Sequence, residues 1–182
     1  MSILRDVTHE THMAVEKLPF VQYLLKGNIT EPHYIVYLNE MLNIYQHLEN
    51  LAQKTGLLNT LPGLARADKI AKDLEELSPN YSGTLCNSTV QYLDYLTELS
   101  NSDRKHQLFA HIYVRHLGDM YGGKLIARVV PGSGRWYEFD NRVELLKNFN
   151  AMLNMDLADE ALVSFAHYGN IFKDLWNKIH TV

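Results

Sequence analysis

The sequence predicts an all-α fold, an irregular bundle of about eight helices that forms one domain over residues 1–182. Apolar residues recur at helical spacing through most of the chain. No strand-like alternation of apolar and polar residues persists beyond a few positions. Proline, glycine and capping residues then divide the chain into segments of helical length.

Each expected helix has a start or a stop signal. The helices are expected over residues 2–17, 20–26, 31–54, 64–77, 88–99, 103–130, 140–155 and 158–179. Pro19 opens the second helix; Thr30 is a suitable N-cap for the third, and Gly56 stops it. Pro–Gly and Ser–Pro pairs bound the fourth helix, and the fifth follows as an amphipathic run. Asp103 opens the long sixth segment, a Pro–Gly-rich turn ends it, and Asp156 caps the last helix.

Composition excludes several classes of protein. With 46% hydrophobic and 21% charged residues and a net charge of −4, the chain is typical of a globular protein and lacks the basic surface of a nucleic-acid binder. No run of about 20 apolar residues predicts a membrane span, and the N-terminus lacks a signal peptide's apolar core. The single cysteine, Cys86, fits a reducing compartment and a buried position. We expect a cytoplasmic monomer.

The first helix carries a polar stripe. Arg5, His9, His12 and Glu16 are spaced to lie on one face. Residues expected to pack on the other side are Leu4, Val7, Thr11, Val15 and Leu18. The stripe is either a solvated face or a ligand site in which His12 binds a metal and Glu16 orients its ring. One histidine suffices only for haem iron, because the porphyrin supplies four nitrogens.

Three glycines interrupt the long sixth segment. Gly118, Gly122 and Gly123 together forfeit roughly 3 kcal/mol of helix propensity relative to alanine. Missing side chains allow a flat ligand to approach the backbone, with the Asp119 carboxyl group beside it to order water and relay protons. Close packing between helices or a local kink is the alternative explanation.

Three segments resemble signatures of the haem oxygenase family. The run "RHLGDMYGGK" resembles the helix on the distal side of the haem, with its GD-x-x-GG core. "ETHMAVEK" resembles the proximal segment, in which a glutamate follows a histidine by four positions, and "NIYQHLEN" resembles a segment that pairs tyrosine with glutamate. The resemblance extends over most of the chain in the right order.

The resemblance implies roles for twelve residues. His12 is the axial ligand of the haem iron, and Glu16 is its hydrogen-bond partner. The residues implied in catalysis are Asp119, Tyr45, Arg115, Gly118 and Gly122. Those implied in binding haem, besides the axial pair, are Arg5, Tyr113, Gly123, Phe165 and Lys147. The family's second propionate clamp matches Asn150, which is not a cation, so Lys147 or Arg142 has to replace it.

By the same resemblance, haem b is both cofactor and substrate, and dioxygen opens its ring to biliverdin, with the IXα isomer as the expected product, and releases carbon monoxide and ferrous iron. Electrons come from an external donor such as ferredoxin, because no flavin or nicotinamide motif is present. Arg5, Arg115, Lys124 and Arg128 are expected to form a basic docking patch. A downstream bilin reductase is a further expected partner.

Two other readings remain open from the residues alone. A carrier or sensor would hold haem without opening its ring. A carboxylate-bridged di-iron oxidase would use Glu40, Glu49, Asp159 and His167, although the chain has no Glu-x-x-His pair. The remaining histidines, both tryptophans and the Tyr34–Tyr37–Met41 stripe are interpreted as packing or surface residues; these histidines are His33, His47, His106, His111, His116, His167 and His180.

Overall fold

The all-α prediction is confirmed by the computed structural model, which describes residues 4–181 and has no strand within them. The α-helices are α1 (Arg5–Glu16), α2 (Pro19–Leu25), α3 (Glu31–Lys54), α4 (Ala67–Leu77), α5 (Asn87–Ser100), α6 (Leu108–Ile112), α7 (Gly118–Ile126), α8 (Arg142–Met152) and α9 (Ala158–His180). Three 3₁₀ turns, η1 (Lys105–Gln107), η3 (Arg135–Tyr137) and η4 (Met155–Leu157), and a π-helix, η2 (Tyr113–Leu117), complete the described helical structure. None of the described helices is both long enough and apolar enough to span a bilayer.

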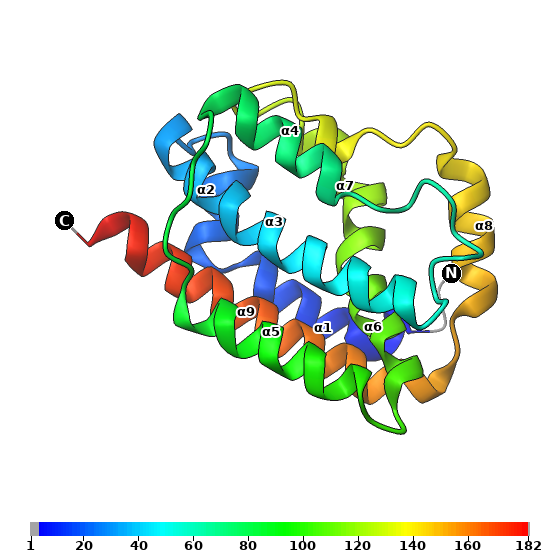
Figure 1. Cartoon of the computed structure of the whole chain (residues 1–182). Coiled ribbons are helices and arrows are strands. Elements are labelled where there is room, and N and C mark those ends of the chain that lie inside the picture. The colour runs from blue at the N-terminus through cyan, green and yellow to red at the C-terminus, as the bar shows by residue number, and fades with distance from the viewer. Residues whose placement is uncertain (1–3, 182) are drawn as a thin grey trace.

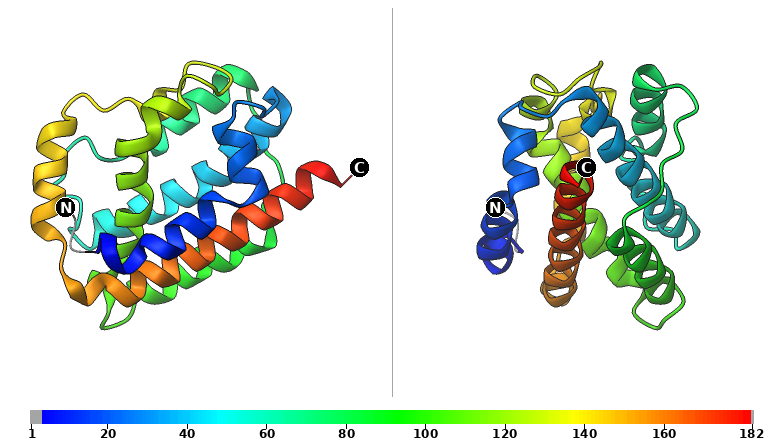
Figure 2. Two further views of the ribbon diagram at one scale, coloured as in Figure 1. Left: turned by 180° about the vertical axis from the view of Figure 1, so that it is seen from behind. Right: turned by 90° about the vertical axis from the view of Figure 1, so that its left-hand side faces the viewer.

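The long helices α3, α5 and α9 run along the bundle, and the segment α6–η2–α7 stands across them (Figure 1). α9 lies in the middle, since it packs on α1, α2, α5 and α6. In the right-hand view of Figure 2, α1 lies outermost on one side of α9, while α4 and α5 lie on the other. Of the two elements that the sequence singled out, α1 packs on α9, whereas α7 packs on η3 and on α2.

Most boundaries follow the sequence signals. α3 covers the predicted residues 31–54, with Thr30 extended before it and Pro32 in its first turn. Gly56 ends α3 with φ = +78°, a left-handed conformation that glycine adopts without a steric penalty. The predicted helix over 103–130 is wrong as a uniform helix, because it divides into η1, α6, η2 and α7 and ends at Ile126.

The π-helix η2 is the main departure from the expected pattern. All five of its residues are buried, including Arg115 and His116. A π-turn changes the rotation of the residues that follow it, and such turns occur frequently at functional sites. η2 directly precedes Gly118 and Asp119, so it sets the direction in which α7 presents them.

The face of α1 that packs on the bundle also differs from the expectation. Val7 is 40% exposed, and Thr8 is buried in its place. The Thr8 hydroxyl donates to the carbonyl of Leu4, which satisfies the polar group inside the packed face. The predicted polar stripe of α1 does point outward, because Arg5, His9 and His12 are exposed.

The glycine-rich turn after α7 returns the chain to the core. Trp136, in η3, is fully buried. Its backbone N–H donates to the Asp73 carboxylate of α4 at 2.9 Å, and the N–H of Arg135 donates to the same carboxylate at 3.0 Å. Arg66 donates to the carbonyls of Trp136 and Glu138. These bonds fix the turn against the start and the middle of α4.

Gly123 serves this packing. A Cβ atom at Gly123 would lie 2.8 Å from Cδ1 and 2.9 Å from Cβ of Tyr137, closer than real Cβ contacts. Tyr137 is buried and stacks on Trp136, so it has little room to move. The missing side chain of Gly123 is therefore explained by contact between α7 and η3, the close-packing alternative considered above.

We expect Gly123→Ala to lower the free energy of unfolding by about 1 to 3 kcal/mol, because it overpacks a buried contact. Gly122→Ala is the matched control, since no atom lies within 4 Å of a Cβ built there. That variant is expected to gain up to about 1 kcal/mol from helix propensity. Urea unfolding of both variants measures the difference, and equal effects would contradict the assignment of Gly123 to packing.

Candidate active site

The Asp119 carboxyl group is the centre of a buried polar cluster under α7. Asp119 is 7% exposed. Its Oδ2 accepts a hydrogen bond from the Tyr45 hydroxyl at 2.7 Å and another from the Trp136 indole Nε1–H at 3.0 Å. Because Tyr45 belongs to α3 and Trp136 to η3, the two hydrogen bonds join α3, η3 and α7.

Burial raises the pKa of Asp119 to about 6, because an ionised carboxylate loses hydration there. The charge of His116, the two hydrogen bonds and the charge of Arg115 oppose this effect. A carboxyl group with this pKa exchanges protons near neutral pH.

Glu49, one turn after Tyr45 on α3, holds two further parts of the structure by hydrogen bonds. Its carboxylate accepts from the backbone N–H groups of Arg66 at 2.6 Å and Ala67 at 3.1 Å, and so caps the N-terminus of α4. The same carboxylate lies 2.9 Å from Nε2 of the fully buried His116. Both residues of the tyrosine–glutamate segment of α3 therefore contact the polar groups around Asp119: Tyr45 contacts Asp119 itself, and Glu49 contacts His116.

Arg115 is a buried cation held by aromatic rings. Its guanidinium lies 4.2 Å from the ring centroid of Tyr168 and 4.9 Å from that of Tyr92. Nε of Arg115 donates to the Tyr92 hydroxyl at 3.4 Å, and Nη2 is buried with no hydrogen-bond partner among the described residues. Because Arg115 is 1% exposed, it cannot belong to the predicted surface docking patch.

A chain of hydrogen bonds continues from Arg115 toward the surface. The Tyr92 hydroxyl lies 2.8 Å from Nδ1 of His111, and Nε2 of His111 lies 3.0 Å from Glu160. Burial lowers the pKa of His111, which favours the neutral ring. A carboxylate only accepts, so Nε2–H donates to Glu160 and Nδ1 accepts from Tyr92. Arg104, whose side chain is 59% exposed, completes the chain at Glu160.

His12 presents an accessible imidazole on α1. Its Nε2 lies 3.5 Å from Oε1 of Glu16, and the two side chains are 49% and 41% exposed. The ring meets the edge of Phe165 of α9, with centroids 5.8 Å apart. The structure thus brings three residues named from the resemblance into contact.

The outer surface of α7 has bare backbone at Gly118 and Gly122. Nothing lies within 4 Å of a Cβ built on Gly118 or on Gly122, in contrast to Gly123. Tyr121 and Leu125, on neighbouring turns, are 61% and 66% exposed. A flat, largely apolar ligand such as haem fits this combination of open backbone and apolar side chains, with the accessible imidazole of His12 to ligate its iron.

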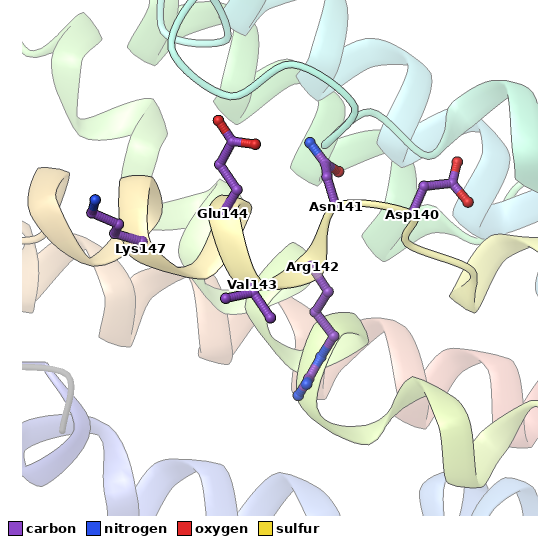
Figure 3. Close-up of a pocket in the computed structure, with 6 residues that line it drawn as sticks. All are labelled: Asp140, Asn141, Arg142, Val143, Glu144 and Lys147. Atoms are coloured by element: carbon purple, nitrogen blue, oxygen red, sulfur yellow. The ribbon is translucent and has the colours of Figure 1, made fainter.

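The cations expected at the propionates lie on α1 and α8. Arg5 is exposed at the first turn of α1. At the start of α8 a surface pocket is lined by residues of one segment, and Figure 3 shows Arg142 pointing to the opposite side of the helix from Lys147. Nε of Arg142 donates to the carbonyl of Met120 in α7 at 2.7 Å. Of the two candidate cations on α8, Arg142 is thus the one bonded to α7.

Several site residues were not found from the sequence. Trp136 and His116 were interpreted as packing or surface residues, yet Trp136 donates to Asp119 and His116 pairs with Glu49. Their partners are 17 and 67 positions away, so no helical spacing signals them. Tyr113, which the resemblance places at the haem edge, is buried in η2.

The di-iron alternative finds no support in this arrangement. Glu40 accepts hydrogen bonds from the N–H of Cys86 and from Lys178. It shares no partner with Glu49, whose carboxylate is bonded to Arg66, Ala67 and His116. His167 packs between the rings of Tyr92 and Tyr95. Within residues 4–181, no three histidine, cysteine, aspartate or glutamate side chains converge on a possible metal site.

Comparison with known proteins agrees with this geometry. The family model "Heme oxygenase" matches residues 1–176. "Heme oxygenase 2" of Synechocystis is 26% identical, and the match covers 88% of this chain and 73% of the relative. "Heme oxygenase 2" of the rat is 25% identical, and the match covers 95% of this chain and 64% of the rat protein.

Solved structures match over nearly the whole chain. Heme oxygenase-1 from Synechocystis in complex with heme has a TM-score of 0.85 at 21% identity and covers 97% of this chain and 91% of its own. The heme oxygenase of Leptospira interrogans has a TM-score of 0.82 at 25% identity and covers 94% of this chain and 98% of its own. The helical layout predicted from the sequence is therefore the one found in these structures.

We expect Asp119→Asn to raise the free energy of unfolding at pH 8 by about 1 to 3 kcal/mol. The folded-state pKa of Asp119, about 6, lies above the ordinary value of 3.8, so the folded chain keeps a proton that the unfolded chain has released between these pH values. Wild-type stability therefore falls as pH rises through this window, and asparagine removes that loss. Denaturant unfolding at pH 4 and pH 8 measures it, and an equal difference at both pH values would contradict the buried-carboxyl assignment.

Proposed function

The chain belongs to the haem oxygenase family, and we propose that its own residues open the haem ring to biliverdin, with release of carbon monoxide and ferrous iron. The observation that carries the assignment of roles is the Asp119 carboxyl group, held beside a helix surface that has no side chains at Gly118 and Gly122. The oxidant is dioxygen, and the electrons come from an external donor.

Bound haem supplies the iron that binds dioxygen and the ring carbon that is oxidised. His12 is the residue that would ligate the iron, and Glu16 beside it would accept from the ring and fix its orientation. Phe165 restricts the imidazole from the α9 side. Arg5 and Arg142 are the cations suited to the carboxylates of the ligand, Arg5 from α1 and Arg142 beside α7.

On the distal side, Gly118 and Gly122 allow the ligand to approach the backbone of α7 closely. Asp119 orders water there and holds or releases a proton near neutral pH, with Tyr45 as its hydrogen-bond donor. The buried charge of Arg115 favours negative charge developing nearby, because little water screens it. These groups deliver a proton while excluding bulk water.

The electron donor that we propose is a small acidic protein such as ferredoxin. Lys124 and Arg128 are exposed on and just after α7, and Arg5 is exposed on α1. When the two protein surfaces carry opposite charge, the rate of their encounter rises more than their final affinity. Arg115 is left out of this patch because it is buried.

Hemin titration of the purified protein tests the ligand assignment. We expect a Soret band at one haem per chain, and a large loss or shift of that band in His12→Ala, because the variant lacks the axial imidazole. His9→Ala, an exposed histidine on the same helix, is the matched control and should keep the band. Equal behaviour of the two variants would refute the role of His12.

Single-turnover reaction with ascorbate tests the role of Asp119. We expect Asp119→Ala to keep the haem spectrum and to lose at least about 100-fold in biliverdin formation, the usual range for removing a proton-transfer group. A protein that only carries haem would form no biliverdin in either case. Full ring opening by the variant would remove Asp119 from the mechanism.

Charge reversal tests the docking patch. We expect Lys124→Glu/Arg128→Glu to lower ferredoxin-driven turnover at low salt by about tenfold or more, because electrostatic steering is reversed. Turnover with ascorbate should stay unchanged, since that reductant needs no docking surface. Lys105→Glu, in η1 before the start of α6, is the control for charge alone.

A further inference from the structure

The Trp136 side chain has a fixed direction in the core. Its backbone N–H is bonded to Asp73 at 2.9 Å, and its ring stacks on Tyr137 with the planes at 16°. The ring of Tyr45 meets it edge-on at 5.3 Å. An indole held on three sides has one conformation, so its N–H is aimed before any ligand binds.

That N–H and the Tyr45 hydroxyl converge on the same carboxylate oxygen. Both donate to Oδ2 of Asp119, at 3.0 Å and 2.7 Å. No hydrogen bond from another described residue reaches Oδ1. A carboxylate oxygen that has two donors is directionally fixed, and the other oxygen of the group is then fixed as well.

We propose that Trp136 is a positioning residue for ring opening: with Tyr45 it clamps Oδ2 of Asp119, so that Oδ1 is the oxygen that holds the reactive water. The inference rests on the proposed role of Asp119. Phenylalanine would keep an aromatic ring at this position but has no N–H to donate to the carboxylate, so the nitrogen of the indole is the part that matters. Asp73 acts through Trp136, because it holds the backbone of η3 in place.

Other charges near Asp119 have to be separated from this effect. The cations around it are His116, Arg115 and Arg66, of which His116 has the largest influence. The titratable neighbours on the surrounding helices are Tyr34, Tyr37, Tyr45, Tyr137 and Tyr168. Burial raises the pKa of each of these tyrosines, so none of them ionises between pH 4 and pH 9. His116, which pairs with Glu49 and whose charge acts on Asp119, is therefore the neighbour that has to be separated by mutation.

The indole signals of the unloaded protein test the hydrogen bond directly. The chain has two tryptophans, so a ¹⁵N-labelled sample gives two indole N–H signals, and Trp136→Phe identifies one of them. We expect the Trp136 signal to move with a midpoint near pH 6, the pKa of Asp119. In Asp119→Asn this titration should vanish. The Trp176 ring packs on His180, 3.8 Å away between ring centroids, so its signal should be the same in both proteins.

Loss of the donor should raise the pKa of Asp119, because a hydrogen bond to the ionised form favours that form. We expect an increase of about one pH unit in Trp136→Phe, the size of one hydrogen bond to a charged group. ¹³C-carboxyl signals of labelled aspartate measure it, with His116→Gln as a second sample that removes the charge of His116. The pH profile of ascorbate-driven turnover should move upward by the same amount.

A second replacement guards against a purely steric effect of phenylalanine. Benzothienylalanine at position 136, in a Trp176→Phe background, keeps the bicyclic shape and replaces N–H by sulphur. It should reproduce the increase in the pKa of Asp119 with near wild-type thermal stability. Trp176→Phe alone should leave the pKa of Asp119 and the pH profile unchanged.

Two outcomes would overturn the proposal: an indole signal that ignores Asp119→Asn, or an unchanged pH profile in both Trp136 replacements. Failure of the proposed function looks different. If Asp119→Ala opened the ring at the wild-type rate, Asp119 would lose its role, while the titration of the Trp136 signal in the unloaded protein would still report the hydrogen bond.

Discussion

The buried carboxyl group of Asp119 is the constraint on which the rest of this structure depends. A carboxylate away from water is tolerated only when hydrogen bonds and nearby cations compensate for its lost hydration. Here the donors come from α3 and η3, and the cations come from η2. α3, η3 and η2 therefore all act on the Asp119 side chain. The π-turn η2, directly before α7, sets the direction in which α7 presents it.

The glycines on α7 divide into two functions that their sequence spacing does not distinguish. Gly123 lets Tyr137 lie against the helix, and through Tyr137 it supports the indole that reaches Asp119. Gly118 and Gly122 face open space. The nine-residue helix α7 thus packs tightly on its inner side at Gly123. On its outer side it presents bare backbone at Gly118 and Gly122, where a ligand can approach.

Buried ionisable groups near the site form two separate hydrogen-bonded sets. Glu49 holds both the start of α4 and His116, and Glu160 holds His111. Arg115 joins the set that contains His111 through Tyr92, with the rings of Tyr92 and Tyr168 beside its guanidinium. Such sets stabilise the fold less than an apolar core of equal size would. Their presence next to the open helix surface is the mark of a reaction site more than of a structural one.

The sequence by itself determined the helical class, nearly all helix boundaries, the outward stripe of α1 and the pairing of His12 with Glu16, because these depend on spacing within one helix. It also pointed to Asp119 and Tyr45 through their resemblance to a known family. Only the tertiary structure decided that Gly123 is a packing residue, that Arg115 is buried, and that Trp136 and His116 belong to the site. Those facts depend on contacts between segments far apart in the chain, and local periodicity carries no information about them.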